Sequence, residues 1–151
     1  KLLKENHLTI AAAESATGGM FTSAITDVPG ASEVLGASYV TYSNEAKISS
    51  VGVSQETISA YGVVSPEVAL EMAIGARDLA GADIGISVTG YAGPDADEGH
   101  SAGEAYIGYV FGDQSGTVAI DTARPFRKWN RNFFMLQMLN TVYKLIRDLQ
   151  Q

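Results

Sequence analysis

The segment AAAESATGGM, residues 11–20, places small apolar residues directly before a turn of serine, threonine and two glycines. The apolar run around it predicts a short buried strand over residues 8–14. Apolar residues then recur with helical spacing over residues 18–26, and Pro29 and Gly30 follow as breakers. The segment therefore predicts a strand, a tight turn and a helix, which is the first unit of an α/β fold.

The next part of the chain continues this alternation. A β-branched and aromatic run over residues 36–43 predicts a second strand, and a short helix should follow and end at Gly52. Ser65 and Pro66 have the chemistry of a helix start. The helix that they begin should bury one face, made of Val68, Met72, Gly75, Ala76 and Leu79.

The last part of the chain has a different pattern. A strand over residues 82–90 is followed by two strand-like runs, 104–112 and 116–123, and DQSG at 113–116 has the composition of a hairpin turn. A long final helix is indicated by an apolar stripe of Met135, Met138, Leu139, Val142, Leu145, Ile146 and Leu149.

These elements predict a three-layer α/β/α fold with a mixed, mostly parallel sheet, a C-terminal hairpin and a long helix. The 151 residues, 46% of them hydrophobic, are enough for one core, so we expect a single domain over residues 1–151. The chain begins with Lys1 instead of methionine. We therefore expect the natural chain to extend further upstream.

Composition excludes several classes of function. The chain has no cysteine, so it has no disulfide framework, Fe–S cluster or thiolate zinc site, and we expect a cytoplasmic protein. A net charge of −7, from 17 acidic and 10 basic residues, opposes binding to nucleic acid. Every apolar run is shorter than the roughly 20 residues that a membrane span needs, so no membrane partner is expected.

The turn after the first strand is a candidate site. Ser15, Thr17, Gly18 and Gly19 would bring two hydroxyls and several backbone N–H groups to the start of a helix, where an anion or a developing oxyanion is stabilised. The alternative is a helix cap, with a serine or threonine hydroxyl accepting a hydrogen bond from the first turn. The turn alone does not separate the two.

A serine nucleophile needs a base, and the segment VTYSNEAK, residues 40–47, offers one. The two histidines of the chain stand in poor places for a Ser-His-Asp triad, which leaves Lys47. A half-buried Lys47 would have a lowered pKa, and the Tyr42 hydroxyl could orient it. The alternative is a surface lysine paired with Glu33 or Glu45, beside a tyrosine that covers the sheet edge.

The third candidate is the loop after the strand at 82–90. Thr89, Gly90 and Gly93 would form a rigid wall of the same crevice. Three acidic residues, Asp95, Asp97 and Glu98, follow together with His100. Its spacing does not match a calcium-binding loop, so we interpret it as a solvated acidic loop and expect no metal.

Four segments, in this order and at about this spacing, resemble the C-terminal domain of the CinA (competence/damage-inducible) family: AAAESATGG, VTYSNEAK, YGVVSPEVALEMAIGA and SVTGYAGPD. The resemblance covers nearly the whole chain, from Leu8 to the final helix. Members of that family include bacterial nicotinamide-nucleotide amidases, which hydrolyse the carboxamide of nicotinamide mononucleotide to nicotinate mononucleotide and ammonia. The resemblance implies an amidohydrolase with a small nucleotide substrate and no metal or redox cofactor.

The resemblance also implies roles for particular residues. Ser15 would attack the amide carbon, Lys47 would take its proton and deliver it to departing ammonia, and Tyr42 would hold the pair in register. Backbone N–H groups near Gly18 would hold the oxyanion. The substrate crevice would be formed by Thr17, Gly18, Gly19, Asn44, Thr89, Gly90 and Gly93.

Two segments depart from the family pattern. DADEGHSAG, residues 95–103, stands where the family has a glycine pair and then Lys-Pro, and PFRKWNRN, residues 125–132, replaces a Phe-Gly-Asp-Arg run with a second arginine. We assign the phosphate to Arg131, with Arg127 and Lys128 as other possibilities, while Trp129 has no clear counterpart. The departures keep a second function open, a non-catalytic paralogue that binds a nucleotide-like ligand or a protein partner. We expect a homodimer, the usual state at this size.

Overall fold

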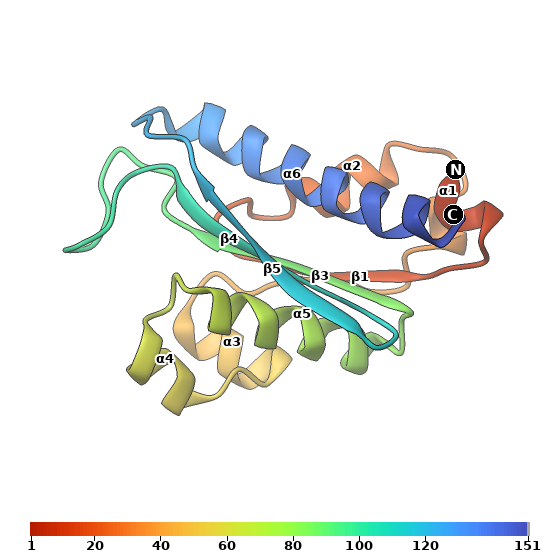
Figure 1. Cartoon of the computed structure of the whole chain (residues 1–151), viewed down its shortest axis with the longest axis horizontal. Helices are drawn as coiled ribbons and strands as arrows, with labels where there is room; N and C mark the ends of the chain where they lie inside the picture. Colours follow the sequence, from red (N-terminus) through yellow and green to blue (C-terminus); the bar gives the residue numbers. More distant parts are fainter. Residues whose placement is uncertain (151) are drawn as a thin grey trace.

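A five-stranded sheet forms the middle layer of the computed structural model, which describes residues 1–150 (Figure 1). The strands are β1 (Ile10–Glu14), β2 (Tyr39–Val40), β3 (Ile84–Gly90), β4 (Glu104–Phe111) and β5 (Gln114–Asp121), in the spatial order β2-β1-β3-β4-β5. β1 pairs parallel with β2 and β3, whereas β4 pairs antiparallel with β3 and β5. Only β4 therefore runs against the other strands, and the predicted mixed sheet with a C-terminal hairpin is confirmed.

Helices cover both faces of the sheet. The α-helices are α1 (Leu2–Glu5), α2 (Met20–Thr26), α3 (Asn44–Val51), α4 (Gln55–Tyr61), α5 (Pro66–Ala80) and α6 (Arg127–Arg147), with short 3₁₀ helices at Ala31–Glu33 and Asp148–Gln150. Figure 1 shows α1, α2 and α6 on one face of the sheet and α3, α4 and α5 on the other. The three-layer α/β/α prediction is confirmed.

The alternation of side chains along β1 separates two apolar cores. Ile10 and Ala12 face the α6 side, whereas Ala11 and Ala13 face α5, and all four are fully buried. The α5 side is packed tightly because glycines face it. A Cβ added at Gly85 or Gly108 would collide with backbone carbonyls of α5.

Some predicted details are wrong. Leu79 is exposed, because the buried stripe of α5 has a spacing of four residues and continues to Ala80. Leu149 is exposed because α6 ends two residues earlier, at Arg147. The hairpin turn lies at residues 112–113, where Gly112 takes a left-handed conformation, so Gln114 already belongs to β5.

The predicted strand at 36–43 is reduced to the two residues of β2, and α1 and α4 were not predicted. Within residues 1–150, no helix has the length and apolar character needed to cross a membrane.

Candidate active site

The carboxyl ends of β1, β2 and β3 lie at one edge of the sheet, where open parallel sheets bind their ligands. A cavity of about 240 Å³ lies there. Its walls contain Ser15, Ala16, Tyr42, Asn44, Lys47, Val63, Val64, Thr89, Gly90, Tyr91, Ala92, Gly93, Asp95 and Arg127. All three segments that were predicted to form the crevice therefore contribute to one cavity.

Ser15 and Lys47 meet at the floor of this cavity. The Lys47 ammonium donates to Ser15 Oγ at 3.0 Å and to the Thr41 carbonyl at 2.9 Å. Lys47 lies in α3, whose first turn is capped by the Ser43 hydroxyl, and its side chain is only 1% exposed. Burial disfavours the cation and lowers the pKa of Lys47 from 10.5 to about 8. The alternative of a surface lysine paired with a glutamate is wrong.

The turn that carries Ser15 is held by hydrogen bonds to the side chain of Glu14, which is fully buried. One carboxylate oxygen accepts hydrogen bonds from Thr17 Oγ1 at 2.6 Å and from the Phe21 N–H at 2.9 Å. The other accepts from the N–H and the hydroxyl of Thr22, at 2.9 and 2.6 Å. Glu14 therefore caps α2, which leaves the Ser15 hydroxyl free for Lys47.

This arrangement changes the expected position of the oxyanion site. The N–H of Gly18 donates to the Ser15 carbonyl at 2.9 Å, so it is not available to a substrate. Gly18 and Gly19 have φ angles of +60° and +103°, which glycine adopts readily, and they shape the turn without lining the cavity. Ala16 does line the cavity, and its N–H has no acceptor among residues 1–150. The Ala16 N–H is thus better placed for an oxyanion.

Side chains from the first turns of α6 bind both the turn after β1 and the loop after β3. Arg131 Nε donates to the Ala16 carbonyl and Arg131 Nη2 to the Thr17 carbonyl, both at 3.0 Å. Asn130, which is fully buried, donates to the Ala92 carbonyl at 2.8 Å. Arg131 thus positions the serine turn instead of lining the cavity, and Thr17 also lies outside it because its hydroxyl bonds to Glu14.

Tyr42 and Arg127 lie together at the rim. Arg127 Nη2 donates to the Tyr42 hydroxyl at 2.9 Å, and Arg127 Nη1 donates to the Gly93 carbonyl at 2.8 Å. The Tyr42 side chain is 59% exposed, and its hydroxyl has no hydrogen bond to Ser15 or Lys47. The geometry therefore places Tyr42 at the entrance, and Arg127 is the arginine that lines the cavity.

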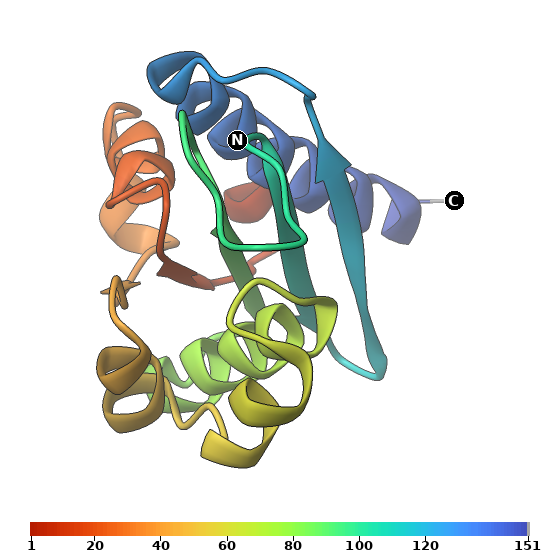
Figure 2. The ribbon, with the colours of Figure 1, turned by 90° about the vertical axis from the view of Figure 1, so that its left-hand side faces the viewer.

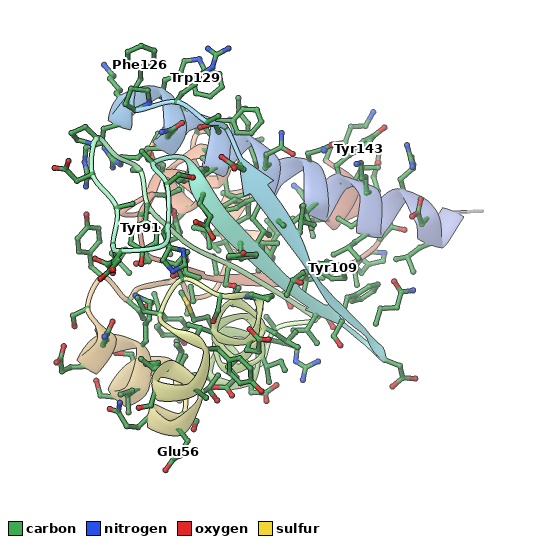
Figure 3. The ribbon with its side chains drawn as sticks, turned by 60° about the vertical axis from the view of Figure 1, so that its left-hand side comes forward. Glu56, Tyr91, Tyr109, Phe126, Trp129 and Tyr143 are labelled. Atoms are coloured by element: carbon green, nitrogen blue, oxygen red, sulfur yellow. The ribbon has the colours of Figure 1, made fainter. Side chains whose placement is uncertain are left out.

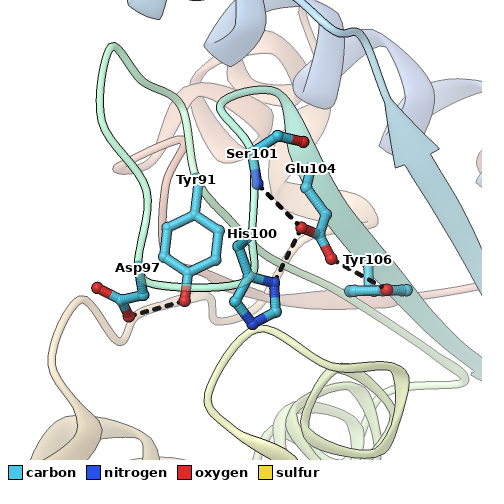
Figure 4. Close-up of polar contacts among 6 residues, drawn as sticks. All are labelled: Tyr91, Asp97, His100, Ser101, Glu104 and Tyr106. Atoms are coloured by element: carbon cyan, nitrogen blue, oxygen red, sulfur yellow. Dashed lines mark hydrogen bonds and ion pairs between the residues drawn. The ribbon is translucent and has the colours of Figure 1, made fainter.

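The loop over residues 91–103 forms the outer wall, in front of the sheet in Figure 2. Thr89 is anchored below it, where its hydroxyl donates to the Val63 carbonyl at 2.9 Å. Inside the loop the Tyr91 hydroxyl donates to Asp97 at 2.8 Å, and His100 Nδ1 lies 2.9 Å from the Glu104 carboxylate (Figure 4). Burial and the nearby Asp97 raise the pKa of Tyr91.

The acidic residues of this loop point in different directions. Asp95 lines the cavity, Asp97 bonds to Tyr91, and Glu98 is exposed. Among the described residues, no three histidine, aspartate or glutamate side chains come together in a way that could hold a metal ion.

A known family matches almost the whole chain. The sequence profile described as the CinA C-terminal domain matches residues 1–149. The chain belongs to the CinA C-terminal domain family. A putative competence-damage inducible protein of Acetivibrio thermocellus is 54% identical over 132 residues, which are 87% of this chain and 31% of that protein. A protein of the same description from Bacillus pumilus is 52% identical over 108 residues, 72% of this chain and 26% of that protein.

Solved structures of CinA proteins have the same fold. A CinA superfamily protein from Escherichia coli superposes with a TM-score of 0.91 at 33% identity, covering 95% of this chain and 83% of that one. One from Klebsiella pneumoniae has a TM-score of 0.93 at 28% identity, covering 97% and 92%. This CinA domain spans about a quarter to a third of the length of the curated relatives named above.

Proposed function

We propose that this CinA domain is an amidohydrolase that converts the carboxamide of nicotinamide mononucleotide to the carboxylate, releasing ammonia. The observation that carries the proposal is the pair at the cavity floor, a buried lysine amine 3.0 Å from a serine hydroxyl. A serine hydroxyl becomes a nucleophile when an adjacent base takes its proton, and a desolvated lysine can be that base. The substrate is inferred from the family resemblance described above.

The chemistry proceeds in two steps. Neutral Lys47 accepts the hydroxyl proton of Ser15 while Oγ bonds to the amide carbon, and the carbonyl oxygen becomes an oxyanion beside the Ala16 N–H. Lys47 then protonates the departing nitrogen, the C–N bond breaks, and ammonia leaves an acyl-enzyme ester. Water gives a proton to Lys47 as its oxygen bonds to the ester carbon. The C–O bond to Ser15 then breaks, Lys47 returns the proton to Ser15 Oγ, and the acid is released with both residues in their starting state.

The protonation state of Lys47 makes the rate depend on pH. With a pKa of about 8, roughly a tenth of the molecules have a neutral Lys47 at pH 7. The neutral fraction increases as the pH rises through 8. Turnover should therefore increase over this range and level off above it, provided that the substrate itself is stable.

Ammonia release from nicotinamide mononucleotide tests the proposal. Wild type should turn over, whereas Ser15→Ala and Lys47→Ala should not, although circular dichroism should show both variants to be folded. Ser59→Ala and Lys144→Ala are matched controls, because both side chains are exposed and lie outside the cavity. A folded wild-type protein without turnover would refute this substrate.

The rim favours a second candidate, a CinA domain that binds a small ligand or a protein partner without catalysis. Asp95 adds a negative charge to the cavity wall, and Arg127 is already bonded to Tyr42 and to the Gly93 carbonyl. Both features weaken the attraction of a phosphate. Calorimetric binding of nicotinamide mononucleotide to wild type without ammonia release would favour this candidate.

A further inference from the structure

The loop after β3 brings an aromatic residue, Tyr91, to the wall of the cavity that also contains Ser15 and Lys47. Figure 3 shows Tyr91 in the loop between β3 and β4. In the sheet β1 lies between β2 and β3, so the loops that carry Tyr42 and Tyr91 emerge on either side of Ser15. A ligand that reaches Ser15 through the cavity therefore has Tyr91 at its side.

Several contacts hold Tyr91 in one position. Its N–H donates to the Glu104 carbonyl at 2.8 Å, and its carbonyl accepts from the Gly103 N–H at 2.7 Å. Its hydroxyl donates to Asp97 at 2.8 Å, and its ring lies 5.1 Å from the His100 ring between centroids, at an interplanar angle of 43° (Figure 4). A side chain that is already ordered in this way loses little conformational entropy when a ligand binds against it.

The His100 ring is held in turn by the Glu104 carboxylate. This carboxylate lies 2.9 Å from His100 Nδ1, and it accepts hydrogen bonds from the Ser101 N–H at 3.4 Å and from the Tyr106 hydroxyl at 3.3 Å (Figure 4). Tyr91 lines the cavity whereas His100 does not. His100 and Glu104 therefore support the Tyr91 ring from outside the cavity and leave its cavity side for a ligand.

The chemistry of this ring favours a flat ligand with a positive charge. The face of an aromatic ring carries partial negative charge and attracts a cation within about 6 Å of its centre. A phenol that donates its proton to a carboxylate, as Tyr91 does to Asp97, has a more electron-rich ring. The nicotinamide ring of nicotinamide mononucleotide is flat, and its nitrogen is positively charged because it is bonded to ribose.

We propose that Tyr91 is a specificity-determining residue that binds the flat, cationic ring of the substrate amide against its face. This role rests on the proposed function, which supplies the amide, and it adds that the domain selects the oxidised, cationic ring over the reduced, neutral ring. Ser15 then attacks an amide whose ring is positioned by Tyr91, while the hydroxyl bond to Asp97 fixes the orientation of the tyrosine.

Reduced nicotinamide mononucleotide is the matched probe, because it keeps the carboxamide, ribose and phosphate but has a neutral dihydropyridine ring. Calorimetry in a Ser15→Ala background measures the dissociation constants of both forms without hydrolysis. We expect this background to bind the oxidised form about tenfold more tightly than the reduced form. Addition of Tyr91→Leu should remove most of this preference, whereas Tyr91→Phe should largely keep it because the ring remains. The compared side chains are all neutral, so the charge of the cavity stays constant.

Tyr143→Leu is the matched control, since Tyr143 is 49% exposed on α6 and is well separated from Tyr91 in Figure 3. It should leave both dissociation constants unchanged. If Tyr91 only packed the loop, Tyr91→Leu would weaken the binding of both forms equally, and that result would overturn the proposal. Equal affinity of the Ser15→Ala background for the two forms would also overturn it, as would binding of neither.

Ammonia release by wild type distinguishes a failure of this proposal from a failure of the proposed function. Ammonia release from nicotinamide mononucleotide, together with equal affinity for the two forms, would refute the role of Tyr91 and leave the amidase intact. A preference that depends on Tyr91, without ammonia release, would support the role of Tyr91 and refute the amidase. Circular dichroism of each variant confirms that it is folded.

Discussion

Ser15 and Lys47 at the cavity floor are buried, and neighbouring groups hold both of them in place, whereas Tyr42, Asp95 and Arg127 at the rim are exposed. At the floor, the serine turn is fixed from one side by Glu14 and from the other by α6. At the rim, the one hydrogen bond between side chains joins Tyr42 to Arg127 within the described chain. This difference suggests that the floor performs the chemistry and the rim selects the ligand, so changes at the two places should affect different kinetic constants.

The largest effect is expected from Lys47→Met. We predict that turnover falls by about a thousandfold or more, because no base remains for Ser15. The variant should nevertheless be more stable at pH 7, since a pKa lowered to about 8 means that burying this cation costs on the order of 3 kcal/mol. Ammonia release and thermal melting measure the two effects.

The pH dependence of the same variant sharpens the test. The folded protein binds Lys47's proton less tightly than the unfolded chain, so wild type should gain stability as the pH rises from about 8 towards 10.5. Lys47→Met has no such gain. The difference in Tm between this variant and wild type should therefore become smaller over this pH range. A difference that stays constant would show that the lysine is not destabilised by burial. Lys144→Met is the exposed control.

Glu14→Gln should have the next largest effect. The amide keeps one acceptor oxygen but turns an NH₂ group towards donors, so part of the α2 cap is lost. We expect about 3 kcal/mol of lost stability in urea unfolding and about a hundredfold lower kcat, because the serine turn loosens. Glu56→Gln, at an exposed residue of α4, should change neither quantity. Unchanged kcat in a destabilised Glu14 variant would mean that the cap serves the fold alone.

The two arginines of α6 allow a direct comparison of floor and rim. Arg131→Lys offers one ammonium nitrogen in place of the two guanidinium nitrogens that contact the serine turn. This substitution should weaken the two hydrogen bonds, and we predict about a tenfold lower kcat with little change in KM. Arg127→Lys should instead raise KM and largely keep kcat. Steady-state kinetics on the two variants measure the split. The opposite result would exchange the roles assigned to the residues.

Asp95→Asn should have the smallest effect. Removal of one exposed negative charge at the rim should lower KM for a phosphate-bearing amide by about threefold, since exposed charges interact weakly. The advantage should disappear in high salt. A KM that is equally low at all salt concentrations would indicate a contact with the ligand instead of a field effect.

The fold could be predicted because local patterns and sheet topology determine it, whereas the Ser15–Lys47 pair was predicted only once the family resemblance was added to the local patterns. Both residues follow strands whose carboxyl ends must meet, and the small residues of β1 indicated a buried strand. The capping role of Glu14 was not predicted, because a glutamate at the end of a strand is normally exposed to solvent. Its burial depends on donors from Thr17, Phe21 and Thr22, which are arranged only once α2 has formed.

The roles of the arginines could not be predicted for a different reason. Arg127 and Arg131 are four residues apart on one helix, so the sequence alone does not separate them. The structure does, because the helix phase turns one towards the Ala16 and Thr17 carbonyls and the other towards Gly93. Tyr42 was placed with the catalytic pair by resemblance, whereas its strand ends so early that the side chain reaches the entrance.

The hold of α6 on the serine turn has a consequence for synthesis of the protein. The hydrogen bond from Arg131 to Ala16 joins residues 115 positions apart in the chain. Because residues leave the ribosome in order, β1 and its serine emerge long before the helix that secures their geometry. A nascent chain would carry Ser15 and Lys47 without the completed cavity, and the arrangement proposed to be active would be assembled only when α6 is released.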